Sequence, residues 1–398
     1  MEDTFSSSQK YLDIMKDAED KILEFLEEET DFEGKFIILE NNLNDTKIRS
    51  DPYELLSLLH LVLKIGNNHF RTTNFFDKIE RILQYFKEDI KKYYPNSELF
   101  NIFKSNKRIL LFLIEQKILI FNDYIVKKIT MTEKYINSSY PQYFQPEIQP
   151  FIDEDWFQNN NCKLPYKKWI KEIKRDLPEN FYEKRKKGEN DSTICEFIQN
   201  DMIKEFVIYI NKCNISPDTF IQPSIYETNS FLIKKQIKTS DDQFFFKKDR
   251  VSLIEYAAFF GSIQIFKYLR INCAKLTPSL WYFGIHGKNG EILHILEEDH
   301  IEIDDLSYKQ LFYESIKCHH YEFADYFMNN FIQNKEESSE VLFNRCLKYY
   351  NFAFLKNELI GESSFCSLCK YDYCTLVDYL LKSKGIDIDK KDIFLFNC

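Results

Sequence analysis

The chain has 398 residues, of which 44% are hydrophobic and 29% charged, and its formal net charge is -10. This composition can bury a large core, so it excludes a disordered acidic polymer. The negative charge argues against a nucleic-acid partner, because binding DNA or RNA begins with the neutralisation of phosphates. Only 9 glycines occur, which leaves little material for phosphate-binding loops and favours helices.

The first ten residues, MEDTFSSSQK, are acidic and polar and lack the features of a secretory signal. The apolar stretches 55–63 and 109–121 do not supply the ~20 uninterrupted apolar residues of a membrane-spanning helix. We therefore expect no transmembrane segment and a location in the cytoplasm, with the nucleus as the alternative. The 10 cysteines are expected to be reduced thiols.

Amphipathic helices are predicted from the start of the chain. Residues 10–33 place apolar side chains on one helical stripe, which predicts a single helix. The next helix is predicted to start at Asp51, which is a capping residue followed by Pro52 in the first turn. Glu54 is placed to return a hydrogen bond to the backbone of the cap. Periodic apolar positions over 75–94 and 99–126 predict further helices.

Prolines interrupt this pattern over residues 138–165, where we expect a hinge or an irregular cap. Residues 163–187 then carry ten basic and four acidic side chains. We interpret them as a solvated helix face that runs into a linker; the alternative is a nuclear-import or anion-binding patch. The expected domains are an N-terminal helical region over 1–190 and a repeat region over 191–398.

A phrase recurs in the second region. Residues 252–269 read SLIEYAAFFGSIQIFKYL and residues 279–296 read SLWYFGIHGKNGEILHIL, in register. Comparable phrases recur with spacings of 27, 31, 31 and 22 residues, aligned on Ile265, Ile292, Phe323, Phe354 and Leu376. Each consists of two short apolar segments and a turn, which predicts two antiparallel helices per unit. Such a pair cannot bury its own apolar stripe, so stacked neighbours must supply the core.

Ser252 to Gly261 resembles the first helix and turn of an ankyrin repeat, whose pattern is T-P-L-H-x-A-A-x-x-G. Segments 290–296, 375–381 and 385–389 are similar to the second helix and the finger loop of that repeat. In the later units the turn glycine is replaced by Lys288, His319, Tyr350 and Asp372.

Together with segments 51–56, 104–114 and 371–373, these units make the chain similar to the lineage-expanded ankyrin families of parasitic protists such as trichomonads. The ankyrin-like unit of those families is a domain of unknown function. Segment 99–114 can also be laid on a repeat, with Asn106 at its turn.

The resemblance implies an all-α helical solenoid, with N-terminal helices followed by ankyrin-like repeats, that binds a protein partner without catalysis. Its concave face and finger loops would carry the contacts. One exposed position of the first helix recurs in five units, at Glu255, Tyr282, Tyr313, Asn344 and Cys366; loop candidates are Asp304, Asp305 and Asp387. Aromatic anchors favour Tyr282 and Tyr313. The partner and the oligomeric state stay open. The nine residues after Asp389 are too few for another two-helix repeat, so the alternatives are a truncated repeat array or dimerisation at this end.

Few residues suggest chemistry. Cys366 and Cys369 form a single C-x-x-C, a weak signal for zinc or redox activity, and we interpret Cys369 as a small packing residue. His319 and His320 are expected to form hydrogen bonds at a helix start. His286 and His294 are each expected to stand alone, apart from other candidate residues. We predict no catalytic residue, no metal ligand and no cofactor. The alternative is an enzymatic or nucleic-acid-binding N-terminal region that the repeats direct to its target.

Overall fold

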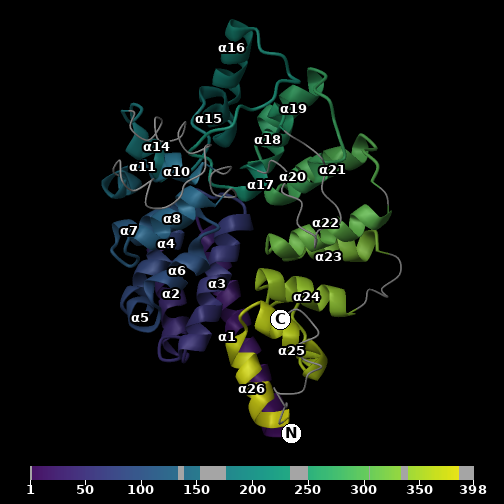
Figure 1. The fold of residues 1–398 in the computed structure, drawn as a ribbon. Helices are drawn as coiled ribbons and strands as arrows, with labels where there is room; N and C mark the ends of the chain where they lie inside the picture. Colours follow the sequence, from purple (N-terminus) through teal and green to yellow (C-terminus); the bar gives the residue numbers. More distant parts are fainter. Residues whose placement is uncertain are drawn as a thin grey trace. The chain divides into compact units, whose positions relative to one another are not determined.

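The computed structural model describes residues 2–132, 139–152, 176–233, 250–303, 305–332 and 339–384. Within these ranges the regular elements are helices, apart from one isolated bridge between Phe220 and Ser252 (Figure 1). The all-α class predicted from the sequence is confirmed. Among the described helices, none combines the length and the apolarity needed to cross a membrane.

The chain divides into two compact units, which we describe separately. Unit 1 combines Met1–Asp89 with Leu280–Cys398, and unit 2 is Ile90–Ser279. The boundary expected near residue 190 falls inside unit 2. Unit 1 therefore joins the first helices of the chain to the last ones.

Unit 1 contains four N-terminal helices and a series of short C-terminal helices. The first group is α1 (Glu2–Glu27), α2 (Phe32–Asn44), α3 (Pro52–Asn68) and α4 (Phe75–Tyr85). The second group is α20 (Leu280–His286), α21 (Gly290–Glu298), α22 (Asp305–Lys317), α23 (Tyr321–Asn330), α24 (Ser339–Tyr349), η2 (Asn357–Leu359), η3 (Glu362–Ser364), α25 (Phe365–Lys370) and α26 (Cys374–Lys384).

Unit 2 is built from shorter helices. They are α6 (Asn96–Phe103), α7 (Lys107–Glu115), α8 (Asp123–Met131), α10 (Tyr140–Tyr143), α11 (Gln145–Ile148), η1 (Gln149–Phe151), α14 (Phe181–Lys187), α15 (Thr193–Gln199), α16 (Ile203–Cys213), α17 (Ser230–Ile233), α18 (Leu253–Phe259) and α19 (Ile263–Ile271). Helix α5 (Lys87–Tyr93) spans the boundary of the two units. As expected, Asn106 lies between two helices, and its side chain caps α7 by accepting the N–H groups of Arg108 and Ile109.

The predicted helix start at Asp51 is confirmed. Its carboxylate accepts the N–H groups of Tyr53 and Glu54 at 2.8 and 3.2 Å, and Pro52 is the first helical residue. The return bond expected from Glu54 is absent, since its Oε2 is buried without a hydrogen-bond partner. The single helix expected over residues 10–33 is wrong, because α1 ends at Glu27 and α2 begins at Phe32.

Side-chain hydrogen bonds explain this break. The Glu28 carboxylate accepts the backbone N–H groups of Thr30 and Asp31 at 2.7 and 3.0 Å. The Asp31 carboxylate then caps α2 by accepting the N–H of Gly34. Such local bonds compete with helix continuation, and an apolar stripe alone does not reveal them.

Five successive turns share one backbone conformation. In each of the five predicted repeats, the residue that follows the first helix has a φ value between 47° and 66°, in the left-handed region. These residues are Gly261, Lys288, His319, Tyr350 and Asp372. At the first turn, Gly261 N–H donates to Ala258 O and Ser262 N–H to Ala257 O. The N–H groups of His319 and His320 repeat this arrangement on Ile316 O and Ser315 O. This is a common way to end a helix, and it occurs where the sequence alignment places the turns.

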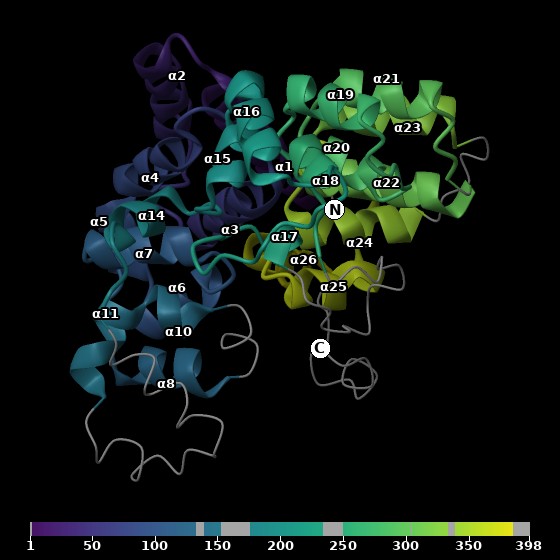
Figure 2. The ribbon, with the colours of Figure 1, turned by 90° about the horizontal axis from the view of Figure 1, so that it is seen from above.

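Helices of equivalent position lie next to each other within each unit. In unit 1, α20 packs against α22 and α22 against α24, while α21 and α23 return beside their partners (Figures 1 and 2). In unit 2, α15 contacts α18 and α16 contacts α19. The last helix of unit 1, α26, packs against α1 and α3.

The fourth repeat departs from the prediction. No α-helix forms around Phe354, and only the short η2 and η3 lie between the turn at Tyr350 and α25. The N–H groups of Phe352 and Ala353 donate to the Glu19 carboxylate at 2.8 and 3.1 Å. These donors are held by a side chain of α1, which fixes the segment in a non-helical path.

The basic segment near residue 185 forms a helix, as predicted, but its basic face is only partly solvated. Residues 181–187 form α14, which ends at Gly188 with a φ of 72°. Arg185 is 3% exposed, and its Nη1 donates to both Glu147 oxygens at 2.7 and 2.9 Å. Lys186 and Lys187 are exposed, so the solvated face is retained only in part. Residues 163–175 of the basic stretch lie outside the described residues.

Candidate functional site

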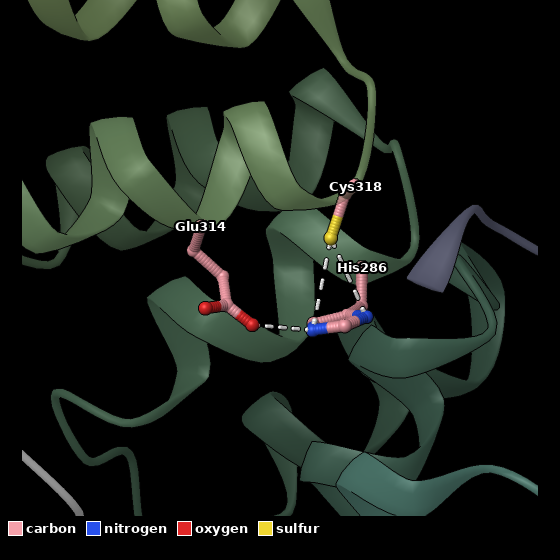
Figure 3. A group of neighbouring side chains, drawn as sticks. All are labelled: His286, Glu314 and Cys318. Carbon is pink, nitrogen blue, oxygen red and sulfur yellow. Dashed lines mark hydrogen bonds and ion pairs between the residues drawn. The ribbon is translucent and has the colours of Figure 1, made fainter. Parts of the chain in front are cut away.

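A group of metal-ligating residue types lies between two neighbouring hairpins of unit 1. His286 is the last residue of α20, Glu314 lies on α22, and Cys318 follows the end of α22. One ligand-type atom from each residue lies within 4.8 Å of the others. Figure 3 shows the Glu314 carboxylate and the Cys318 thiol approaching the same imidazole. The sequence pattern missed this cluster, and the expectation that His286 stands alone is wrong.

Hydrogen-bond distances define the geometry. His286 Nε2 lies 2.7 Å from Glu314 Oε1, and Cys318 Sγ lies 3.6 Å from Nδ1 and 3.7 Å from Nε2 of the same ring. Lys317 Nζ donates to Glu314 Oε1 at 2.5 Å. Since the sulfur is almost equally far from both ring nitrogens, it lies against the imidazole and does not point at one lone pair.

Charge interactions within the cluster favour an ion pair. Burial alone would raise the pKa of Glu314, but Lys317 and His286 outweigh it and hold the pKa well below its usual range. Burial alone would lower the pKa of Lys317, and Glu314 outweighs it and raises the pKa. Glu314 and Lys317 are therefore both ionised at neutral pH.

The cluster does not fit a metal ion. Glu314 Oε1, which a cation would need as a ligand, already accepts hydrogen bonds from Lys317 and His286. A 2.7 Å contact between nitrogen and oxygen is a hydrogen bond and leaves no room for an ion between the two atoms. Burial raises the pKa of the Cys318 thiol well above its ordinary value, which opposes the thiolate that metal ligation requires.

The cluster also resembles a catalytic arrangement in which Cys318 would be the thiol nucleophile, His286 the base and Glu314 the carboxylate that orients the base. A nucleophile must reach its substrate, however, and the exposed fractions of Cys318 and His286 are 0% and 1%. The raised thiol pKa also keeps the sulfur protonated. In this conformation the cluster connects two hairpins, and its chemistry is that of a buried polar contact.

A cavity of about 230 Å³ lies elsewhere in unit 1. Its described lining is mostly apolar and comes from α23, α24 and the segment around η2: Met328, Ser339, Leu342, Phe343, Phe354, Lys356 and Leu359. None of these side chains is a His, Cys, Asp or Glu, so this lining offers no pair of groups for acid–base catalysis at neutral pH.

The five predicted first-helix positions do not share one exposure. Tyr282, Asn344 and Cys366 are half-buried. The expected exposure is wrong for Glu255 and Tyr313, whose exposed fractions are 0% and 8%.

Specific contacts explain the two buried positions. Glu255 Oε2 accepts the N–H of Ser252 at 2.9 Å, which is the returning bond of the predicted capping box, and Ser279 Oγ donates to Oε1 at 2.5 Å. The Arg345 guanidinium lies 5.2 Å from the centre of the Tyr313 ring. Among the loop candidates, Asp304 and Asp387 lie outside the described residues, as does the side chain of Asp305, which begins α22.

The remaining cysteine and histidine predictions fare differently. Cys369, interpreted as a packing residue, is exposed, because its neighbour Leu368 occupies the buried position of α25. His320 lies at a helix start as expected, but its Nδ1 donates to Ile285 O at 2.8 Å and so connects two hairpins. His319 is the turn residue, and its ring contacts Glu19 of α1. His294 is exposed, with Glu297 and Glu298 within 3.6 Å.

Comparison of the chain with protein-family models, with curated proteins and with solved structures finds no match.

Proposed function

We propose that this chain is a non-catalytic protein-binding scaffold, built as an ankyrin-like solenoid. The observation that carries the proposal is the left-handed turn that follows the first helix in each of five successive repeats. Side-by-side packing of equivalent helices, as in α20, α22 and α24, also supports it. A stack of this kind presents a preformed surface, which loses little entropy when a partner docks.

The proposed contact surface, which we call the first-helix face, is defined by Tyr282, Asn344 and Cys366. All three are half-buried and lie on α20, α24 and α25. Tyr282 leads these candidates because aromatic side chains dominate binding energy at protein interfaces. Asp304, Asp387 and Asp305, the last at the start of α22, stay as candidates. The partner is a protein within the cytoplasm or nucleus.

The alternative of a nucleic-acid-binding or enzymatic N-terminal region has less support. Two of the basic residues that would serve it, Lys107 and Arg185, are buried and donate to Ile225 O and to Glu147. Lys186 and Lys187 remain exposed, but the net charge of -10 opposes phosphate binding. We therefore do not advance it.

Site-specific photo-crosslinking of the full chain tests the scaffold. A photoreactive phenylalanine analogue replaces Tyr282 or Asn344 in cells, and His294 serves as the control because it is exposed on the second helix α21. We expect a covalent adduct with one partner protein at Tyr282 and Asn344 and none at His294. Adducts at His294 alone, or no adduct at any of the three positions, would contradict the proposed surface.

A further inference from the structure

The four turns of unit 1 that lack glycine all contact the N-terminal helices. Lys288 forms an ion pair with Glu27 of α1, and His319 Nδ1 contacts the carboxylate of Glu19 on the same helix. Tyr350 stacks on His60 of α3, with ring centroids 4.9 Å apart. Asp372 Oδ2 lies 3.7 Å from Nε2 of the same histidine. Gly261, the turn that keeps glycine, belongs to unit 2.

A left-handed backbone is strained for residues with a Cβ, so glycine is the favoured residue at these turns. Unit 1 accommodates a positive φ at a non-glycine residue elsewhere, as at His300, so strain alone does not call for a partner. At all four of these turns, however, the side chain finds a partner on a helix more than 250 residues earlier in the chain. The sequence alone presents the same departures as degeneracy of the repeat.

The contacts follow the length of α1 in register with the repeats. Glu27 meets the turn at Lys288, Glu19 the turn at His319, and Tyr11 packs edge-on against Phe352 beyond the turn at Tyr350. These α1 positions are eight residues apart, which is about 12 Å along a helix. Packed neighbouring helices are separated by about 8–10 Å, so each repeat presents its turn to the next matching position of α1.

The central contact is buried on both sides. The side chains of Glu19 and His319 are 0% exposed, and Nδ1 lies 2.5 Å from Oε1. His319 Nε2 faces Tyr349 O at 3.2 Å and must donate to it, because a carbonyl only accepts. Oε1 of Glu19 thus contacts the imidazole, while Oε2 accepts the N–H groups of Phe352 and Ala353.

We infer that Lys288, His319, Tyr350 and Asp372 form a docking surface, here called the turn surface, whose ligand is the α1–α3 segment of the same chain. The turn surface is thus occupied within the molecule. Its occupant differs from the proposed protein partner, so the two surfaces can be tested separately.

Glycine substitution at a turn should raise the Tm if the side chain only strains the backbone, and lower the Tm if the side chain holds α1. His300 is a matched control, because it is an exposed histidine of unit 1 with φ 52°. Its turn has the same two bonds, in which the N–H groups of His300 and Ile301 donate to Glu297 O and Leu296 O. His300→Gly removes strain without losing a docking contact, so its Tm should stay the same or rise by about 1–3 °C. His319→Gly removes the imidazole that contacts Oε1 of the buried Glu19 carboxylate, and the Tm should fall by about 5–10 °C.

Hydrogen exchange followed by mass spectrometry locates the effect. In His319→Gly we expect residues 10–27 of α1 to exchange faster while α22 and α23 stay protected. A Tm that rises as in His300→Gly, or unchanged protection of α1, would overturn the inference. If His319→Gly fails to fold, Glu19→Gln provides the same readout: faster exchange confined to α1 supports docking, and uniform loss of protection across unit 1 contradicts it.

Discussion

Lys288 and Glu27 are 261 residues apart in the chain, yet Lys288 Nζ donates to both oxygens of the Glu27 carboxylate at 2.6 and 2.7 Å. His69 Nε2 lies 3.2 Å from the same carboxylate. Burial alone would raise the pKa of Glu27, but His69 and Lys288 outweigh it and lower the pKa to about 2. The contact therefore makes the stability of unit 1 depend on pH.

The sign of this dependence follows from the depressed pKa. The contribution of Glu27 is fully present above its ordinary pKa of 4.5 and is lost as the pH falls from there towards 2. The Glu27 side chain is 33% exposed, so solvent screening limits the contribution to about 1–2 kcal/mol. Urea unfolding should find Glu27→Gln less stable than wild type at pH 6, with a difference of about half that size or less at pH 3. Equal differences at the two pH values would show that Glu27 is not the titrating group.

Replacing one member of the Glu314–Lys317 pair should destabilise the protein more than replacing both members. Glu314→Gln removes the carboxylate charge that lies 2.5 Å from the Lys317 ammonium, whose side chain is 12% exposed. The free energy of unfolding should fall by about 3–5 kcal/mol. Adding Lys317→Met to Glu314→Gln removes the buried ammonium charge as well and should restore at least half of that loss. A double variant as unstable as Glu314→Gln alone would mean that the carboxylate acts through His286 and not through Lys317.

Cys318 should be an inert thiol in the native protein. Its 0% exposure and raised pKa suppress the thiolate that attacks alkylating reagents. Cys213 and Cys273 are exposed and serve as internal controls. After a timed pulse of iodoacetamide, mass spectrometry of the peptides should find both controls labelled and Cys318 labelled only after denaturation. Labelling of native Cys318 at the rate of Cys273 would require an open form of the cluster.

Two neighbouring basic residues should respond differently to the same change. Arg185→Gln leaves Glu147 without its buried partner and should lower the free energy of unfolding by about 3–5 kcal/mol. Lys186→Gln changes an exposed side chain of the same helix, so we expect a change of about 0.5 kcal/mol or less. Urea titrations of both variants measure the difference. Similar small losses would return Arg185 to the solvated face predicted from the sequence.

The local features of the fold were accessible to sequence reasoning. Asp51 and Pro52 gave a helix start because a cap and a first-turn proline act within one helical turn. Gly261 identified the turn position, and the alignment carried it to His319 and Asp372, where φ is also positive. These features depend on neighbours within a few residues, which the sequence displays directly.

The missed features depend on distant partners. His286 precedes its turn by two residues and Cys318 precedes the next turn by one, so overlaying successive turns could have suggested their contact. The burial of Glu255 came from Ser279, which belongs to the following repeat phrase. Nothing in the pattern of α1 indicates that Glu19 meets His319, because 300 residues separate them.

Unit 1 is discontinuous, and this has a consequence for synthesis on the ribosome. Its first part emerges about 190 residues before Leu280, which at about 5–20 residues per second corresponds to a delay of roughly 10–40 s. During that time Glu19 and the apolar side of α1 have no repeats to contact. Contacts of such high sequence separation slow folding, so the nascent N-terminal helices form a natural substrate for chaperones until the C-terminal hairpins are complete.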